Sequence, residues 1–166
     1  MAETEQDPKR PQRKPNRLRE YNYADAGVYF LTVCTKEKAC ILSQITVGAA
    51  IGRPPEVVLS GLGKTVEKTL LEIPAHYPDV FVDHYVIMPN HIHLLLRLDR
   101  GGGRPMAAPT VQQIMNQFKG AVTKRAGMAV WQKGFHDHVV RDQYDYQTRW
   151  QYIDENPIRW ALKNEQ

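Results

Sequence analysis

Two histidines separated by a single residue are the part of this sequence best suited to chemistry. His91 and His93 lie within the largely apolar run Tyr85–Leu96. Alternate side chains of a β-strand point to the same face, so the two imidazoles would project side by side, about 7 Å apart along the strand. Such a pair can bind one divalent metal ion, which would also compensate for burying two polar rings among apolar neighbours.

A second pair with the same spacing, His136 and His138, could form a rival metal site. It is followed by Arg141 and lacks the apolar context of the first pair, so we interpret it as a surface or DNA-contacting edge rather than a ligand set. His76 and His84 are isolated in the sequence, and we predict structural roles for both.

A phenol and a carboxamide come together near the carboxyl end of the chain. Tyr152 and Asn156 are four residues apart, so they are neighbours one turn apart on a helix. A phenol can act as a nucleophile once it is deprotonated or aligned, and an amide oxygen can bind the same metal ion as the two histidines. On spacing alone, an exposed tyrosine and a helix-ending asparagine are the favoured interpretation of this pair.

The elements that must position these residues follow from the apolar periodicity. It predicts strands at 29–34, 80–87, 91–98 and 135–141, and helices at 62–73, 111–125 and 143–156. In the last helix it predicts a core-facing stripe of Tyr146, Trp150, Ile153 and Pro157, with Tyr152 off that stripe. Hairpin-linked strands mixed with helices favour an α+β fold, a ferredoxin-like antiparallel sheet with helices packed on it.

The connections between these elements carry turn and cap residues. Residues 43–55 have the composition of a long hairpin-like connection, and Met88–Asn90 predicts a tight turn between two antiparallel neighbours. The stretch Asp99–Pro109, with three consecutive glycines, predicts a flexible loop. Thr110 is expected to cap the helix that follows, and Pro157 to close the last helix or begin a further turn.

Length and composition indicate one folded domain with a tail. The chain has 166 residues, 42% of them hydrophobic, and a net charge of +4, which favours a polyanionic partner. The composition of residues 1–20 predicts a basic arm that is either flexible or in contact with DNA, and residues 21–166 are predicted to form the folded domain. The sequence has no apolar run long enough to predict a membrane span, and no signal peptide is visible. Cys34 and Cys40 are interpreted as reduced cysteines of a cytoplasmic protein.

Several segments, taken in order, resemble a known family. The run Met88–Leu96 resembles the signature of the single-tyrosine HUH transposases, in which U is a hydrophobic residue. Three further segments, 117–124, 131–141 and 152–157, resemble later parts of the same family, in particular its REP-associated tyrosine transposase branch. The resemblance extends from Gly27 to Leu162 and so covers nearly the whole predicted domain.

The resemblance assigns a role to each candidate site residue. It implies that His91, His93 and Asn156 bind Mg²⁺ or Mn²⁺ and that Tyr152 is the nucleophile, which reverses the interpretation from spacing alone. The implied activity is nicking and joining of single-stranded DNA at hairpin or palindromic elements, through a 5′-phosphotyrosine intermediate. Free tyrosine has a pKa of about 10, so the phenol needs a nearby cation or a base, and the sequence identifies no base.

Several matters stay open at this point. Candidate phosphate contacts are Lys119, Lys124, Arg125, Lys133 and Arg141, although each is also explained as a solvated charge. Trp131 and Phe135 could stack on bases or belong to the core. The resemblance implies a bacterial cytoplasmic protein, associated with the nucleoid when bound to DNA, and allows a homodimer or a monomer. A non-catalytic hairpin-binding protein for DNA or RNA and a water-using metal phosphodiesterase are the alternatives.

Overall fold

The structure is a computed structural model that describes residues 26–48, 52–99 and 109–164. The predicted basic arm at residues 1–20 and the three consecutive glycines at 101–103 lie outside these ranges. Among the described helices, none combines the length and apolar character needed to cross a lipid bilayer.

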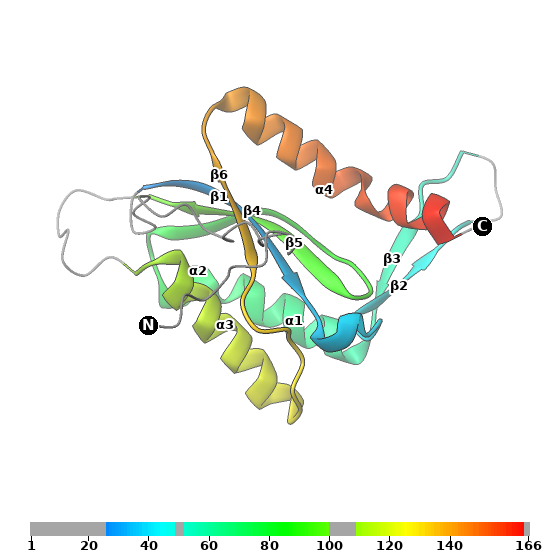
Figure 1. The fold of residues 1–166 in the computed structure, drawn as a ribbon, viewed down its shortest axis with the longest axis horizontal. Coiled ribbons are helices and arrows are strands. Elements are labelled where there is room, and N and C mark those ends of the chain that lie inside the picture. The colour runs from blue at the N-terminus through cyan, green and yellow to red at the C-terminus, as the bar shows by residue number, and fades with distance from the viewer. Residues whose placement is uncertain (1–25, 49–51, 100–108, 165–166) are drawn as a thin grey trace, which may run out of the picture.

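The described elements are six strands, four α-helices and one short 3₁₀ turn (Figure 1). The strands are β1 (Gly27–Cys34), β2 (Ser43–Thr46), β3 (Glu56–Leu59), β4 (Val80–Ile87), β5 (His91–Leu98) and β6 (His136–Val140). The helices are α1 (Gly61–Leu71), α2 (Ile73–His76), α3 (Val111–Ala126) and α4 (Gln143–Asn164), and the turn η1 spans Lys36–Lys38.

Four of the strands form one antiparallel sheet in the order β4-β5-β1-β6, and β2 and β3 form a separate hairpin. Strand β1 pairs with both β5 and β6, and β4 pairs with β5 across the turn at Met88–Asn90. Two crossover helices, α1 and α3, connect strands of this sheet, which gives the ferredoxin-like arrangement. The predicted fold class is therefore confirmed.

The two faces of the sheet are covered by different helices (Figure 1). Helices α1 and α3 pack on one face over a large apolar core that includes Leu31, Leu94 and Ile114, all fully buried. Thr110 caps α3 as predicted, and the side chain of Gln113 completes a capping box with it. The single helix α4 covers the other face, over a much smaller cluster.

The prediction that the last helix ends at Asn156 is wrong, because α4 continues to Asn164 with Pro157 inside it. Proline removes one backbone hydrogen bond from a helix interior. In this helix Ile153, Asn156 and Pro157 are the buried residues, so the proline ring lies in the buried part of α4, and its burial offsets part of that loss.

The predicted core-facing stripe of α4 is also partly wrong. Ile153 and Pro157 are buried as expected, but Trp150 is 36% exposed and stacks on His84 of β4. Tyr152, expected to lie off the stripe, packs against the cluster beneath α4. The buried side of α4 is therefore rotated toward Tyr152, compared with the predicted stripe. The helix contacts β4, β5 and β2 rather than a single strand.

Candidate active site

Strand β5 presents two different faces to its two helix layers. His91, His93 and Leu95 point toward α4, while Ile92 and Leu94 point into the core beneath α1 and α3. His93 is only 5% exposed and His91 is partly buried. The centroids of the two imidazole rings are 4.6 Å apart. The alternation of a β-strand thus brings the two histidines together on one face, as the sequence predicts.

Each imidazole is held by a hydrogen-bond partner at its Nδ1 atom. In His91 this atom lies 2.7 Å from Oδ1 of Asn90. In His93 it lies 2.8 Å from Oγ1 of Thr32, the residue opposite His93 in the pairing of β1 with β5. A partner at Nδ1 fixes the orientation of the ring and, when that nitrogen carries the proton, leaves the lone pair of Nε2 free to bind a cation.

Burial disfavours the charged form of both rings. It lowers the pKa of His93 to about 3, with a smaller contribution from the neighbouring His91, while a hydrogen bond with Asn156 acts in the opposite direction. The pKa of His91 is lowered for the same main reason, again opposed by Asn156, and the ammonium of Lys38 lowers it further. Neutral imidazoles are the form in which histidine binds metal ions.

Helix α4 supplies the other two predicted residues. The ring of Tyr152 lies 5.3 Å from that of His93, centroid to centroid. Asn156 is buried, acts on both imidazoles by hydrogen bonding, and donates from Nδ2 to the backbone carbonyl of Tyr152 at 2.7 Å. That bond occupies the amide nitrogen and leaves the oxygen of Asn156 available. All four residues predicted for the site therefore lie together within one chain.

Residues that the sequence did not reveal complete this arrangement. The ring of Phe30 stacks on His93 at 5.3 Å and meets Tyr152 edge-on at 5.9 Å. The guanidinium of Arg159 lies 5.2 Å from the centroid of the Tyr152 ring. Phe30 and Thr32 alternate along β1 and lie opposite Leu95 and His93 of β5. This pairing identifies them as neighbours of the site, and the sequence alone does not give the pairing.

Three side chains that could bind a metal ion lie together, but they are not a cluster of His, Cys, Asp and Glu alone. Within the described residues, no three His, Cys, Asp or Glu side chains cluster closely enough to hold a metal ion. The convergent donors are instead two imidazoles and the carboxamide of Asn156.

The second histidine pair lies on the outer strand β6, in keeping with its interpretation as an edge. Nε2 of His138 is 2.7 Å from Oδ2 of Asp145, and Nε of Arg149 donates to the other oxygen of the same carboxylate, Oδ1. His136 is exposed. His84 likewise pairs with Asp154, at 2.7 Å, in addition to stacking on a tryptophan. These contacts join the sheet to α4.

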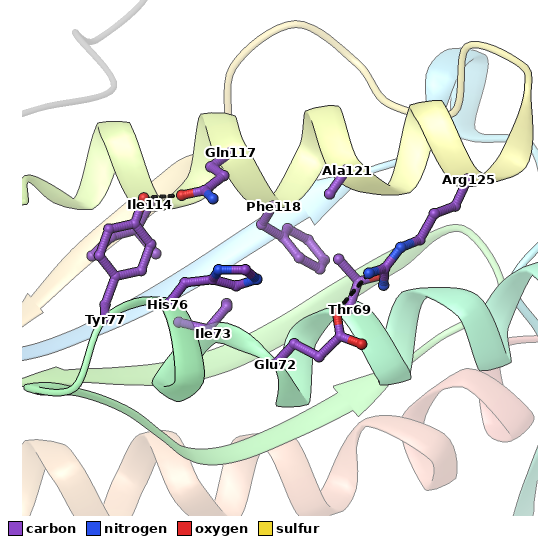
Figure 2. Close-up of a pocket in the computed structure, with 10 residues that line it drawn as sticks. All are labelled: Thr69, Glu72, Ile73, His76, Tyr77, Ile114, Gln117, Phe118, Ala121 and Arg125. Atoms are coloured by element: carbon purple, nitrogen blue, oxygen red, sulfur yellow. Dashed lines mark hydrogen bonds and ion pairs between the residues drawn. The ribbon is translucent and has the colours of Figure 1, made fainter.

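The five basic residues proposed to contact phosphate fall into two groups. Nζ of Lys119 donates to the backbone carbonyls of Gln132 and Gly134, at 2.7 and 2.8 Å. The guanidinium of Arg125 donates to the hydroxyl of Thr69 and to the carboxylate of Glu72. The three side chains line a small pocket between α1–α2 and α3 (Figure 2). The other three, Lys124, Lys133 and Arg141, are exposed. DNA contact by any of the five stays a prediction.

The bulky aromatic residues near β6 belong to the core. Phe135 is 5% exposed and lies in the large cluster beneath α1 and α3, and Trp131 packs against that cluster from its edge. The backbone at Trp131 also bridges to Thr35. Of the two roles left open for these side chains, the structure supports packing.

Comparison with known proteins agrees with this architecture. No model of a known protein family matches the sequence. An uncharacterised protein of Haemophilus influenzae is 32% identical over 168 aligned positions, covering 89% of each chain. A second protein of the same organism, provisionally named a REP-associated tyrosine transposase, is 28% identical over 95 positions, about half of each chain (51% and 52%).

Among solved structures, a REP-associated tyrosine transposase bound to a REP hairpin has the same fold. The TM-score is 0.63 at 20% identity, over 86% of this chain and 73% of the other. The fold is thus that of a REP-associated tyrosine transposase, and the sequence resemblance to this group is confirmed. The chain belongs to one family with the uncharacterised H. influenzae protein.

Proposed function

We propose that this protein nicks and rejoins single-stranded DNA at hairpin elements in the bacterial cytoplasm, through a covalent bond between DNA and Tyr152. The observation that carries the proposal is the convergence of His91, His93, Asn156 and Tyr152 in one chain. Relatives named as transposases, one of them bound to a REP hairpin, support DNA as the substrate.

The donor set fits a divalent cation such as Mg²⁺ or Mn²⁺. His91 and His93 are oriented by partners at Nδ1, and Asn156 keeps its oxygen available while its nitrogen is bonded to the helix backbone. Three protein ligands leave coordination positions for substrate. The chemistry supplied by such an ion is Lewis-acid polarisation of the scissile phosphate and stabilisation of charge on its oxygens.

The residues of α4 account for bond exchange. The phenolic oxygen of Tyr152 attacks phosphorus and loses its proton to solvent. As the new O–P bond forms, the bond to the 3′ oxygen breaks, and that oxygen takes up a proton from solvent. The products are a 5′-phosphotyrosine and a free 3′-hydroxyl, and attack by a 3′-hydroxyl reverses the step without any nucleotide cofactor. The positive charge of Arg159, 5.2 Å from the ring of Tyr152, stabilises negative charge on this side of the site.

The test uses a hairpin oligonucleotide with a single-stranded flank and a fluorophore at its 3′ end, because a 5′-phosphotyrosine retains the fragment on that side. We expect a labelled protein–DNA band on a denaturing gel when Mg²⁺ or Mn²⁺ is present. Tyr152→Phe should abolish the band and keep DNA binding. Tyr144→Phe is the matched control, since Tyr144 lies on the same helix with 80% exposure.

Each contrary result points to one of the alternatives. Cleavage that survives in Tyr152→Phe indicates a phosphodiesterase that uses water. Tight hairpin binding by the wild-type protein with neither cleavage nor a covalent band indicates a binding protein without catalytic activity.

A further inference from the structure

Strand β4 has one residue more than its neighbour β5 over the same stretch of sheet. Val82 pairs with Leu96 and His84 pairs with Leu95, so Asp83 between them has no partner of its own in β5. An extra residue of this kind is a β-bulge, and a bulge redirects the side chains beside it. Leu95 faces α4, so its partner His84 faces α4 as well. Without the extra residue, strict alternation would turn His84 toward the opposite face of the sheet.

The bulge directs two consecutive side chains of β4 at α4. Oδ2 of Asp83 accepts a hydrogen bond from the hydroxyl of Tyr146 at 2.9 Å. The imidazole of His84 stacks on the indole of Trp150, with ring centroids 4.1 Å apart and an angle of 11° between the ring planes. Nε2 of His84 lies 2.7 Å from Oδ1 of Asp154. The three residues of α4 are four apart in sequence, so β4 binds one continuous stripe of the helix.

This stripe and the candidate site lie on opposite sides of the buried line of α4. Ile153, on that line, is 1% exposed and packs in the small cluster against the sheet. At about 100° per residue, Asp154 lies about 100° from Ile153 in one direction around the helix, and Tyr152 about 100° in the other. A rotation of α4 about its axis would therefore move Tyr152 as it separated Asp154 from His84.

Small rotations of α4 are sufficient to matter for a reaction at Tyr152. A side-chain atom about 6 Å from the helix axis moves roughly 1 Å for each 10° of rotation. Displacement of a reacting group by about 1 Å can lower a rate on the order of 100-fold. The apolar cluster beneath α4 has three buried residues, compared with the wide core beneath α1 and α3, so the contacts from β4 are needed to define the rotation.

We propose that His84 fixes the rotation of α4 at which Tyr152 faces His93, and thereby positions the nucleophile. Its two contacts, with Trp150 and Asp154, lie two residues to either side of Tyr152 and act through the backbone of the helix. This inference rests on the proposed function, because it concerns the rate at which Tyr152 becomes joined to DNA.

The first experiment uses nuclear magnetic resonance and needs neither DNA nor metal. In chelator, the wild type should show nuclear Overhauser effects between the ring protons of Tyr152 and His93, whose ring centroids are 5.3 Å apart. His84→Ala should lose most of this intensity. Tyr85→Phe is the matched control and should keep it, because Tyr85 follows His84 in β4 but donates to Glu67 of α1, at 2.7 Å. Equal intensity in His84→Ala and the wild type would overturn the inference.

The second experiment separates the rate of covalent attachment from DNA binding. At saturating hairpin oligonucleotide and Mn²⁺, His84→Ala should attach roughly 10- to 100-fold more slowly, with an unchanged dissociation constant for the oligonucleotide. His84→Gln keeps a donor for Asp154 and His84→Phe keeps a ring on Trp150, so each should recover part of the rate. A loss that weaker DNA binding explains, or one that both of these variants share in full, would contradict a positioning role.

Thermal unfolding distinguishes positioning from a general loss of structure. The side chains of His84 and Asp154 are 24% and 58% exposed, and ion pairs of this kind contribute little to stability. His84→Ala should therefore unfold within a few degrees of the wild type. Should it fail to fold, His84→Gln and His84→Phe carry both measurements against the same control. Absence of a covalent band in the wild type would contradict the proposed function, whereas the Overhauser effects would still test what holds Tyr152 in place.

Discussion

The two faces of strand β5 have the same backbone and very different side chains. Leu94 and its alternating neighbours are buried in a wide apolar core beneath α1 and α3. On the opposite face Leu95 belongs to a cluster of only three buried residues, completed by Phe30 and Ile153, and shares that face with the two histidines. The fold is therefore stabilised mainly from one face, which leaves the other face able to carry buried polar groups.

This difference explains how two histidines are tolerated in an apolar strand. A buried imidazole without a partner is costly, but here each ring has a hydrogen-bond partner at Nδ1 and a carboxamide nearby. Phe30 packs against both His93 and Tyr152, whose rings also contact each other, so the three rings form one aromatic cluster. Rigid neighbours of this kind hold reacting groups in place.

The largest effect expected from the α4 face is its response to a divalent cation. Adding Mn²⁺ should raise the unfolding temperature of the wild type, because a ligand that binds only the folded state stabilises it. A chelator should reverse this rise and reduce covalent DNA attachment to background. The double variant His91→Ala, His93→Ala should show no response to Mn²⁺ in a thermal unfolding assay. A shift of equal size in that variant would place the cation elsewhere.

Adjacent leucines on opposite faces of β5 give the next test. Leu94→Ala should lower the free energy of unfolding by about 2–5 kcal/mol, because it leaves a cavity in the large core. Covalent attachment per folded molecule should stay unchanged. Leu95→Ala should lower both quantities, since Leu95 packs with Phe30 beneath the site.

Urea unfolding measures the stability of the two leucine variants and a titrated denaturing gel measures attachment. Leu71→Ala is the control, because this leucine is 55% exposed. If both β5 variants lost attachment equally, the two faces would not be functionally separate.

The smallest effect concerns acid. The pKa of His93 falls from 6.5 to about 3 on folding, so between these values the unfolded chain binds more protons than the folded one. Stability of the metal-free protein should therefore decrease as the pH falls below 6.5 toward 3, by at most about 1.4 kcal/mol for each pH unit. Urea unfolding in chelator should show this slope, and His93→Gln should reduce it. An unchanged slope in that variant would assign the acid sensitivity to other groups.

The local parts of this structure could be predicted from sequence, and the non-local parts could not. Alternation along β5 predicts the shared face of the two histidines, and the cap at Thr110 begins α3 where expected. The partners Thr32 and Phe30 depend on the register between β1 and β5, which no single segment encodes.

The wrong predictions for the last helix also arise from contacts that are distant in the sequence. Proline normally ends or kinks a helix, yet Pro157 is accepted where α4 is buried against the sheet. The side of α4 that meets the sheet depends on the angle at which the helix crosses it. Trp150 was therefore expected in the core and is found at the surface, in contact with His84.

The bond from the amide of Asn156 to the carbonyl of Tyr152 has a further consequence. It makes Tyr152 and Asn156 parts of one stiff helical segment, and that segment lies against His93 of the same chain. Assembly of these groups thus needs no encounter between molecules. Diluting the protein at saturating DNA should leave the fraction that becomes attached unchanged, whereas a centre shared between two polypeptides would lose attachment on dilution.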